Sequence, residues 1–124
     1  MANPNIAALT NYYGSTSKYN LTFGSNTQLV GNSTNSNYVY KINAITVANK
    51  SATDTGVSVY IADGSTSTTY YHIAYQIAVP PNTSMVITDK NTSFYLLEND
   101  YLRADVTTGG NSVDIIVSWE SILD

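Results

Sequence analysis

The stretch Val113-Asp-Ile-Ile-Val-Ser-Trp119 has the strongest two-residue period in the sequence. Side chains of a β-strand point alternately to its two faces, so this period predicts a strand with one face in an apolar core. The residues on that face are Val113, Ile115, Val117 and Trp119. No segment of ten or more residues keeps a 3.6-residue period, so we expect no helix beyond one or two turns.

Toward the N-terminus, similar short runs are separated by turn residues at the spacing expected of a sandwich or barrel. Residues 57–61 and 101–106 alternate cleanly. In the run before Pro80, Tyr71, Ile73, Tyr75 and Ile77 alternate with Tyr70, His72, Ala74 and Gln76. The apolar parity changes within Tyr38–Val47, which predicts a β-bulge or a strand that crosses between sheets.

The composition also indicates an all-β fold, because 16 Thr, 14 Ser, 14 Asn and 11 Tyr favour strands and turns. A chain of 124 residues has room for one domain with an ordinary core. We therefore predict a single jelly-roll-like antiparallel β-sandwich. Residues 38–124 are expected to form its body. Residues 1–37, which are rich in Asn, Ser, Thr and Gly, are expected to form an N-terminal extended arm or loosely held edge strands.

Groups suited to catalysis are scarce. The sequence has no Cys and one His, and catalysis at neutral pH usually needs an acid, base or nucleophile beside an activating partner. His72 fits a packed or edge-exposed strand residue. Nucleophile-elbow, phosphate-loop and EF-hand motifs are absent from the sequence. We expect no enzyme activity, no catalytic residue, no cofactor and no metal site.

The charge pattern excludes further classes. A net charge of −4 and five scattered cations provide no basic stripe for nucleic acid. No run approaches about 18 apolar residues, so no membrane span is expected. The N-terminus lacks the pattern of a secretion signal. Five Asn-x-Ser/Thr triplets occur, as chance predicts in so Asn-rich a chain, and we expect no glycosylation. They begin at Asn20, Asn32, Asn49, Asn82 and Asn91.

The tyrosines are the remaining candidates for function, because tyrosine packs at one end and stays hydrated at the other. They could fill half-buried sheet faces, form subunit contacts or bind sugars. The candidate interface residues lie in the predicted arm and on the strand before Pro80. They are Tyr12, Tyr13, Tyr19, Tyr70, Tyr71 and Tyr75.

Several stretches together resemble a group of small proteins of tailed bacteriophages, especially phages of cyanobacteria and marine bacteria, that are described as virion structural proteins. The matching stretches are Met1–Ile6, Tyr40–Asn49, Tyr71–Ala74, Ile77–Pro80, Leu97–Arg103 and Val113–Ile122. The group usually has Glu-Gly-Asp where this chain has Glu98-Asn99-Asp100. Asn tolerates a left-handed backbone almost as well as glycine does, so the turn is still expected.

The resemblance implies a non-enzymatic component of the virion, assembled in the host cytoplasm. We expect a capsid decoration (cement) protein that binds the assembled shell. Its partners would be the major capsid protein or other virion proteins, and it would form a homo-oligomer, either a trimer or a dimer. Two alternatives stay open: a tail or neck component, and a glycan-binding fibre module used in host adsorption.

Overall fold

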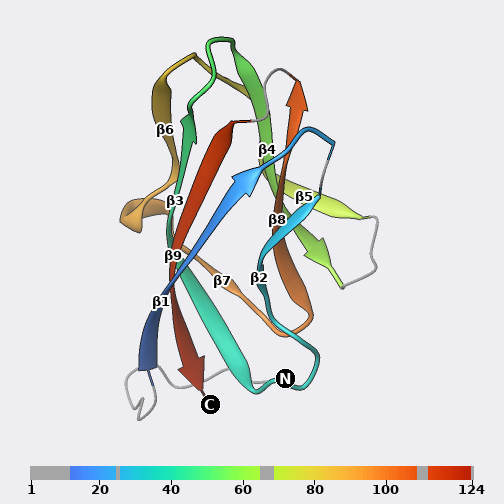
Figure 1. The fold of residues 1–124 in the computed structure, drawn as a ribbon. Helices are drawn as coiled ribbons and strands as arrows, with labels where there is room; N and C mark the ends of the chain where they lie inside the picture. Colours follow the sequence, from blue (N-terminus) through green and yellow to red (C-terminus); the bar gives the residue numbers. More distant parts are fainter. Residues whose placement is uncertain (1–11, 25, 65–68, 109–111, 124) are drawn as a thin grey trace.

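Strands account for most of the chain, as the two-residue periods predict (Figure 1). A computed structural model describes residues 12–24, 26–64, 69–108 and 112–123. The strands are β1 (Tyr12–Leu21), β2 (Thr27–Gly31), β3 (Tyr38–Asn49), β4 (Thr55–Asp63), β5 (Tyr70–Val79), β6 (Thr83–Thr88), β7 (Phe94–Leu96), β8 (Asp100–Thr108) and β9 (Val113–Leu123). A single-turn 3-10 helix, Lys90–Thr92, precedes β7. No helix in the described ranges is long and apolar enough to cross a membrane.

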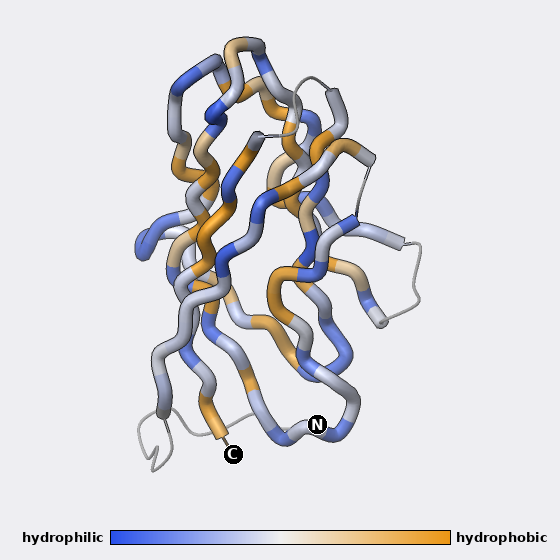
Figure 2. The backbone as a smooth tube through the Cα atoms, viewed as in Figure 1, coloured by the Kyte–Doolittle hydropathy of each residue, from blue (hydrophilic) through white to orange (hydrophobic). Residues whose placement is uncertain are grey.

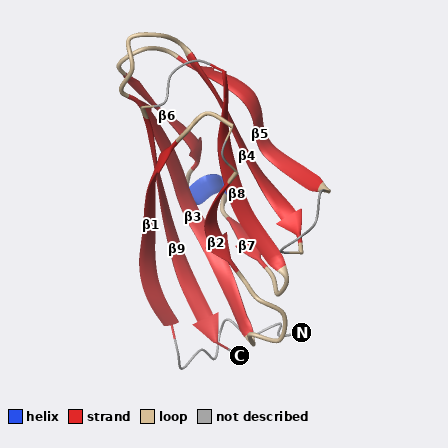
Figure 3. Ribbon diagram, turned by 45° about the vertical axis from the view of Figure 1, so that its right-hand side comes forward, coloured by secondary structure: helices blue, strands red, loops and turns tan. Residues whose placement is uncertain are grey.

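The strands form two antiparallel sheets that pack face to face (Figure 3). The first sheet has the order β1-β9-β3-β6, with β7 also beside β3, and the second has the order β2-β8-β4-β5. The antiparallel pairs are nested, as in one long hairpin that has been rolled up. From the outermost pair to the innermost they are β1–β9, β2–β8, β3–β6 and β4–β5. Pairing of β9 with β3 and of β8 with β4 closes the roll. The predicted jelly-roll-like antiparallel sandwich is therefore confirmed.

The inner faces of the two sheets form one apolar core. Val113, Ile115 and Val117 are fully buried in it and Trp119 is partly buried against it, which confirms the face predicted for β9. They belong to the same buried cluster as Val59 and Leu102 of the second sheet. Figure 2 shows the hydrophobic positions recurring along the strands. Burying one such side chain stabilises the fold by about 1.5–3 kcal/mol.

The parity change predicted within β3 is a β-bulge. The register between β3 and β9 shifts between Ile42 and Ala44. Because the bulge adds one residue, Ile42 and Ile45 both reach the core although they are three positions apart, and both are fully buried. The prediction of a bulge here is confirmed.

The first two strands lie at the outer edges of the sandwich, β1 in the first sheet and β2 in the second. β1 pairs with β9 along its whole length. Leu21 of β1 and Leu29 and Val30 of β2 are buried members of the core cluster. These strands are thus part of the packed domain. That residues 1–37 act as a unit separate from residues 38–124 stays a prediction, and residues 1–11 lie outside the described ranges.

Two buried asparagines hold the loops to the sheets. The Asn32 amide donates hydrogen bonds to the carbonyl oxygens of Tyr38, at 2.9 Å, and Leu96, at 3.1 Å. The Asn49 amide donates to the carbonyl oxygens of Thr53, at 2.8 Å, and Val79, at 2.9 Å. Both residues are at most 2% exposed, so the asparagines of these two Asn-x-Ser/Thr triplets are inaccessible in the folded domain.

Left-handed residues shape the turns, as the sequence predicts for Glu98-Asn99-Asp100. Asn99 has a φ of 70°, which confirms the conformation expected of asparagine there. Gly64, in the turn that follows β4, has a φ of 108°. The sequence Thr-Thr-Gly-Gly-Asn at residues 107–111 predicts a hairpin loop, and this segment lies partly outside the described ranges.

Candidate functional site

The six predicted interface tyrosines fall on two strands at different edges of the sandwich. Tyr13 and Tyr19 lie on β1, at the edge of the first sheet, and are exposed. Tyr12 is the first residue of β1, and its side chain lies outside the described part of the chain. The other three lie on β5, at the edge of the second sheet: Tyr70, Tyr71 and Tyr75. The structure therefore separates the six into two groups.

β5 does not have the regular alternation that the sequence suggests. Tyr60 of β4 lies opposite His72, whereas its neighbour Val59 lies opposite Ala74, so one residue of β5 is extra. Each bulge reverses the parity of the residues that follow it. Ala74 consequently turns to the core and is only 9% exposed. Tyr75 shares the outer face with His72, and the prediction that they lie on opposite faces is wrong.

A second bulge follows directly in β5. Gln76 has a φ of 48°, a backbone region that non-glycine residues rarely adopt. The Gln76 backbone N–H donates a hydrogen bond to the Ser58 hydroxyl at 2.9 Å. Ser58 is buried in the middle of β4. The hydrogen bond therefore fixes the bulge, and the bulge fixes the direction of the Tyr75 side chain.

Four rings form a contiguous cluster on the outer face of the second sheet, here named the β5 aromatic face: Tyr60, Tyr70, His72 and Tyr75. The Tyr60 ring lies 4.5 Å from that of Tyr70 and 5.1 Å from that of His72, between centroids. His72 and Tyr75 meet edge to face at 4.8 Å. Ring pairs in such contacts contribute about 0.5–1.5 kcal/mol beyond their buried area. Tyr60, 2% exposed, is the floor of the cluster, and Tyr75, 64% exposed, is its rim.

Charged groups of β8 lie beside the aromatic face. Arg103 is opposite Tyr60, and Asp105 is opposite Ser58. Burial raises the pKa of Asp105, and the electrostatic interaction with the nearby His72 partly opposes that rise. Burial, and next the negative charge of Asp105, raise the pKa of Tyr60 to about 12. The Tyr60 hydroxyl is therefore neutral at every physiological pH. Asp105 Oδ1 is buried without a hydrogen-bond partner in the described part of the chain.

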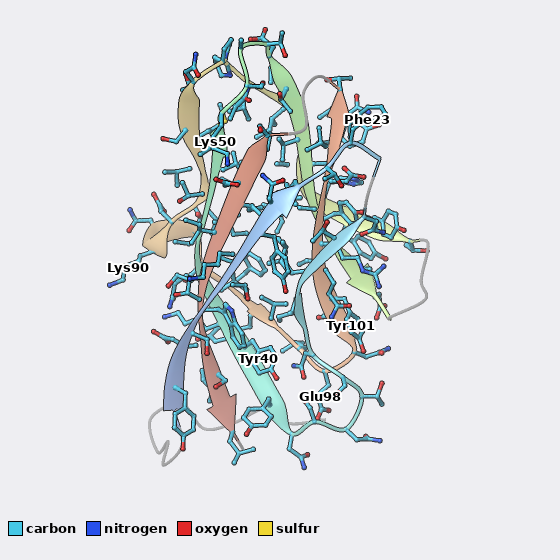
Figure 4. All side chains as sticks on the ribbon, viewed as in Figure 1. Phe23, Tyr40, Lys50, Lys90, Glu98 and Tyr101 are labelled. Atoms are coloured by element: carbon cyan, nitrogen blue, oxygen red, sulfur yellow. The ribbon has the colours of Figure 1, made fainter. Side chains whose placement is uncertain are left out.

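The outer face continues along β8 to Tyr101 (Figure 4). The Arg103 guanidinium lies 5.8 Å from the centre of the Tyr101 ring, within cation–π range. Gly31 of β2 lies opposite Tyr101, and a Cβ there would come within 2.9 Å of the ring. A glycine at position 31 thus leaves room for the Tyr101 ring. The face exposes aromatic surface and few charges, which is the composition of an interface.

Sequence reasoning did not assign three residues to this site: Tyr60, His72 and Asp105. All three occupy positions that alternation assigns to the solvent side of their strands. β4 is in fact buried on both faces, because side chains of β5 and β8 flank its outer face. The sequence does contain a signal for this burial. Residues 56–62 form an uninterrupted run of apolar or small residues, which is typical of a strand with no solvent face.

Two shallow hollows lie on the outer face of the first sheet, away from the aromatic face. One, of 380 Å³, is lined by Ala48, Asn49, Lys50, Asn82, Thr83 and Ser84. The other, of 310 Å³, is lined by Lys18, Tyr19, Asn20, Asp114, Ile115 and Ile116. Between them Lys50 pairs with Asp114 at 3.1 Å. Hydrogen bonds from Asn20 and Lys50 lower the pKa of Asp114. Lys50 and Asp114 therefore already neutralise each other, which leaves them little charge to offer a ligand.

The chemistry available on the β5 aromatic face is recognition. Its groups are stacked rings, one imidazole and a partly buried carboxylate. Within the described ranges, no three His, Asp or Glu side chains come together as metal ligands. Fold and site together define a jelly-roll domain with an aromatic outer face.

Comparison with solved structures shows the same fold. A chain from the crystal structure of the T13 particle of infectious bursal disease virus aligns with a TM-score of 0.53 and 10% identity. The alignment covers 94% of this chain and 32% of the viral one, so this chain spans about a third of its structural neighbour. A chain from the Gt strain of the virus aligns with a TM-score of 0.43 and 12% identity, over 93% of this chain and 31% of that one. No protein-family model matches the sequence, and no curated protein matches it significantly.

Proposed function

We propose that the protein is a structural component of a virion, and specifically a capsid decoration protein that binds the assembled shell through the β5 aromatic face. The observation that carries this proposal is the ring cluster itself, exposed at Tyr75 and packed on a buried Tyr60. An anchored aromatic surface loses little side-chain entropy on docking, which favours a lasting contact.

Two further observations support the proposal. The fold is shared with a chain of an icosahedral virus particle, and the sequence resembles small virion structural proteins of tailed phages. The partner would be the major capsid protein or another virion protein, and the location would be the virion. A tail, neck or glycan-binding fibre role is the alternative, because exposed tyrosines also suit sugar rings.

The proposal is tested by co-sedimentation of the purified protein with shells of its virus that lack it. Tyr75→Ala removes the exposed ring at the rim of the face, so it should leave the fold intact. It should weaken shell binding by about 1–2 kcal/mol, or roughly 5–30-fold. Tyr95→Ala is the matched control, because Tyr95 is an exposed tyrosine of the other sheet. Equal binding by the Tyr75→Ala and Tyr95→Ala variants would contradict the proposed face.

A second measurement separates decoration from host adsorption. A ligand that binds only the assembled shell stabilises that shell by mass action. Particles without the protein should therefore assemble normally but break at a lower temperature than complete particles. Particles that are equally robust but do not adsorb to cells would overturn the decoration proposal in favour of the fibre alternative.

A further inference from the structure

The exposed edges of the two sheets differ greatly in how well they could receive another strand. Edge strands expose unpaired backbone groups, and natural proteins protect them by shortness, bulges, proline or charge. β5 is interrupted by two register shifts, and β2 has five residues and one shift. β6 has six residues, follows Pro80-Pro81 and is also shifted against β3. β7 has three residues. Each of these edges is protected.

β1 is the exception among the described edge strands. Its ten residues pair with β9 in unbroken register, from Tyr12 opposite Ile122 to Leu21 opposite Val113. It contains no proline, and its only charged residue is Lys18. Within the described ranges β9 is its only partner strand, so its other edge faces outward. In Figure 3, β1 lies along the outer margin of the sandwich.

We propose that this edge pairs with β1 of a second copy of the chain, antiparallel, about a twofold axis perpendicular to the first sheet. Such an axis maps each face of the sheet onto itself. Two residues that lie opposite one another across the axis must therefore both have odd numbers or both have even numbers. The pairing would join two five-stranded sheets into one continuous sheet. It goes beyond the proposed decoration function, because it follows from the strand edge alone.

One register uses the exposed side chains of β1 best: the register with Thr16 on the axis. Tyr13 of each copy then lies opposite Tyr19 of the other. These two residues have the same parity and are 60% and 43% exposed in the single chain. Aromatic pairs across antiparallel strands stabilise a sheet. The register therefore forms two such pairs at once.

The same register also explains why the occupant is a second copy. Lys18 lies opposite Gly14, so no like charges meet across the axis. A Cβ built on Gly14 has no atom within 4 Å, which leaves room for the long lysine side chain. A register with Ser17 on the twofold axis would place Tyr13 opposite the buried Leu21, and the two aromatic pairs would be lost.

Cysteine cross-linking tests the register, because the chain has no cysteine of its own. Opposed residues of antiparallel strands have Cα atoms about 4.5–5.5 Å apart, within the range of a disulfide. Thr16→Cys should therefore form a covalent dimer rapidly under mild oxidation. Ser118→Cys is the matched control: Ser118 is also exposed and is paired with Thr16, but one strand further in. Across the proposed axis the two Ser118 residues would lie about 14 Å apart.

A charge substitution tests the affinity. Thr16→Lys would place two ammonium groups against each other on the axis, and the dissociation constant should rise on the order of tenfold or more. Ser118→Lys should leave it unchanged. Sedimentation velocity over a range of concentrations measures both. Thermal melts check that the variants are folded. If the Thr16 variants do not fold, the double variant Tyr13→Cys with Tyr19→Cys provides a second cross-link.

The outcomes decide the proposal. Selective cross-linking at Thr16 with weaker association of Thr16→Lys would support it. A wild-type chain that is monomeric at about 200 µM, far above the micromolar range of ordinary specific association, would overturn it. Equal cross-linking of Thr16→Cys and Ser118→Cys would also overturn it. A monomeric wild type whose Thr16→Lys variant loses shell binding would show that a strand of another virion protein occupies the edge. Tyr75→Ala reports on the decoration proposal separately, because Tyr75 lies on the other sheet.

Discussion

Replacing Leu21 by alanine tests whether the N-terminal strands belong to the folded domain. Leu21 is the last residue of β1, is fully buried and belongs to the central apolar cluster. The substitution removes three carbon atoms and leaves a cavity between the sheets. Such changes cost about 2–5 kcal/mol, depending on how far the surroundings relax.

That cost is a large part of the stability of the domain. A chain of 124 residues has a free energy of unfolding of about 6–19 kcal/mol at ordinary values per residue. A loss near 3 kcal/mol should lower the melting temperature by roughly 10–15 °C for a domain of this size. Urea unfolding should show a lower midpoint with an unchanged slope, because the surface exposed on unfolding is nearly the same.

The control is Ile116→Ala on β9, a neighbouring strand of the same sheet. Ile116 is 49% exposed on the outer face, so its loss should cost less than about 1 kcal/mol. If Leu21→Ala and Ile116→Ala unfold at the same urea concentration, β1 is not packed as described. Residues 1–37 would then be the loosely attached arm that the sequence left open, and a chain starting at Asn37 should fold alone.

Three further predictions concern the core, the loops and the pH dependence. Ile115→Asp places an unpaired charge between the sheets and should cost about 3 kcal/mol or more, so a melt within a few degrees of the wild type would contradict the core assignment. Asn49→Ala removes the side-chain donor to the buried carbonyl group of Val79 and should cost about 1–3 kcal/mol, whereas Asn91→Ala at an exposed position should cost little in the same urea titration. Because burial raises the pKa of Asp105, its neutral form favours the fold: this stability is present below the ordinary aspartate pKa of about 3.9 and is lost as pH rises through the folded value. The melting temperature of Asp105→Asn relative to that of the wild type should therefore increase from pH 3 to pH 7. A difference in melting temperature that stays constant over this range would refute the raised pKa of Asp105.

Local patterns in the sequence were sufficient to predict the fold class and the strands of residues 38–124, but not β1. The period of Val113–Trp119 predicted a strand with one buried face, and β9 has that face. The parity change in Tyr38–Val47 predicted the bulge after Ile42. These features depend on which residues are neighbours along one strand, and the sequence records such neighbours directly. The jelly-roll-like class followed from several short strands without helices.

The pairing of strands decided the candidate site, and the sequence does not record it. His72 and Tyr75 share a face only because β5 bulges against β4, and that register is set by contacts between residues far apart along the chain. The burial of Tyr60 likewise depends on the strands that flank β4. In the part of the chain that the structure describes, β1 stands out as an edge because β9 is its only partner strand and the register between them is unbroken. Side-chain parity along a strand is a local property that the sequence determines, whereas the face that a residue shares with its neighbours depends on cross-strand register, which only the packed sandwich determines.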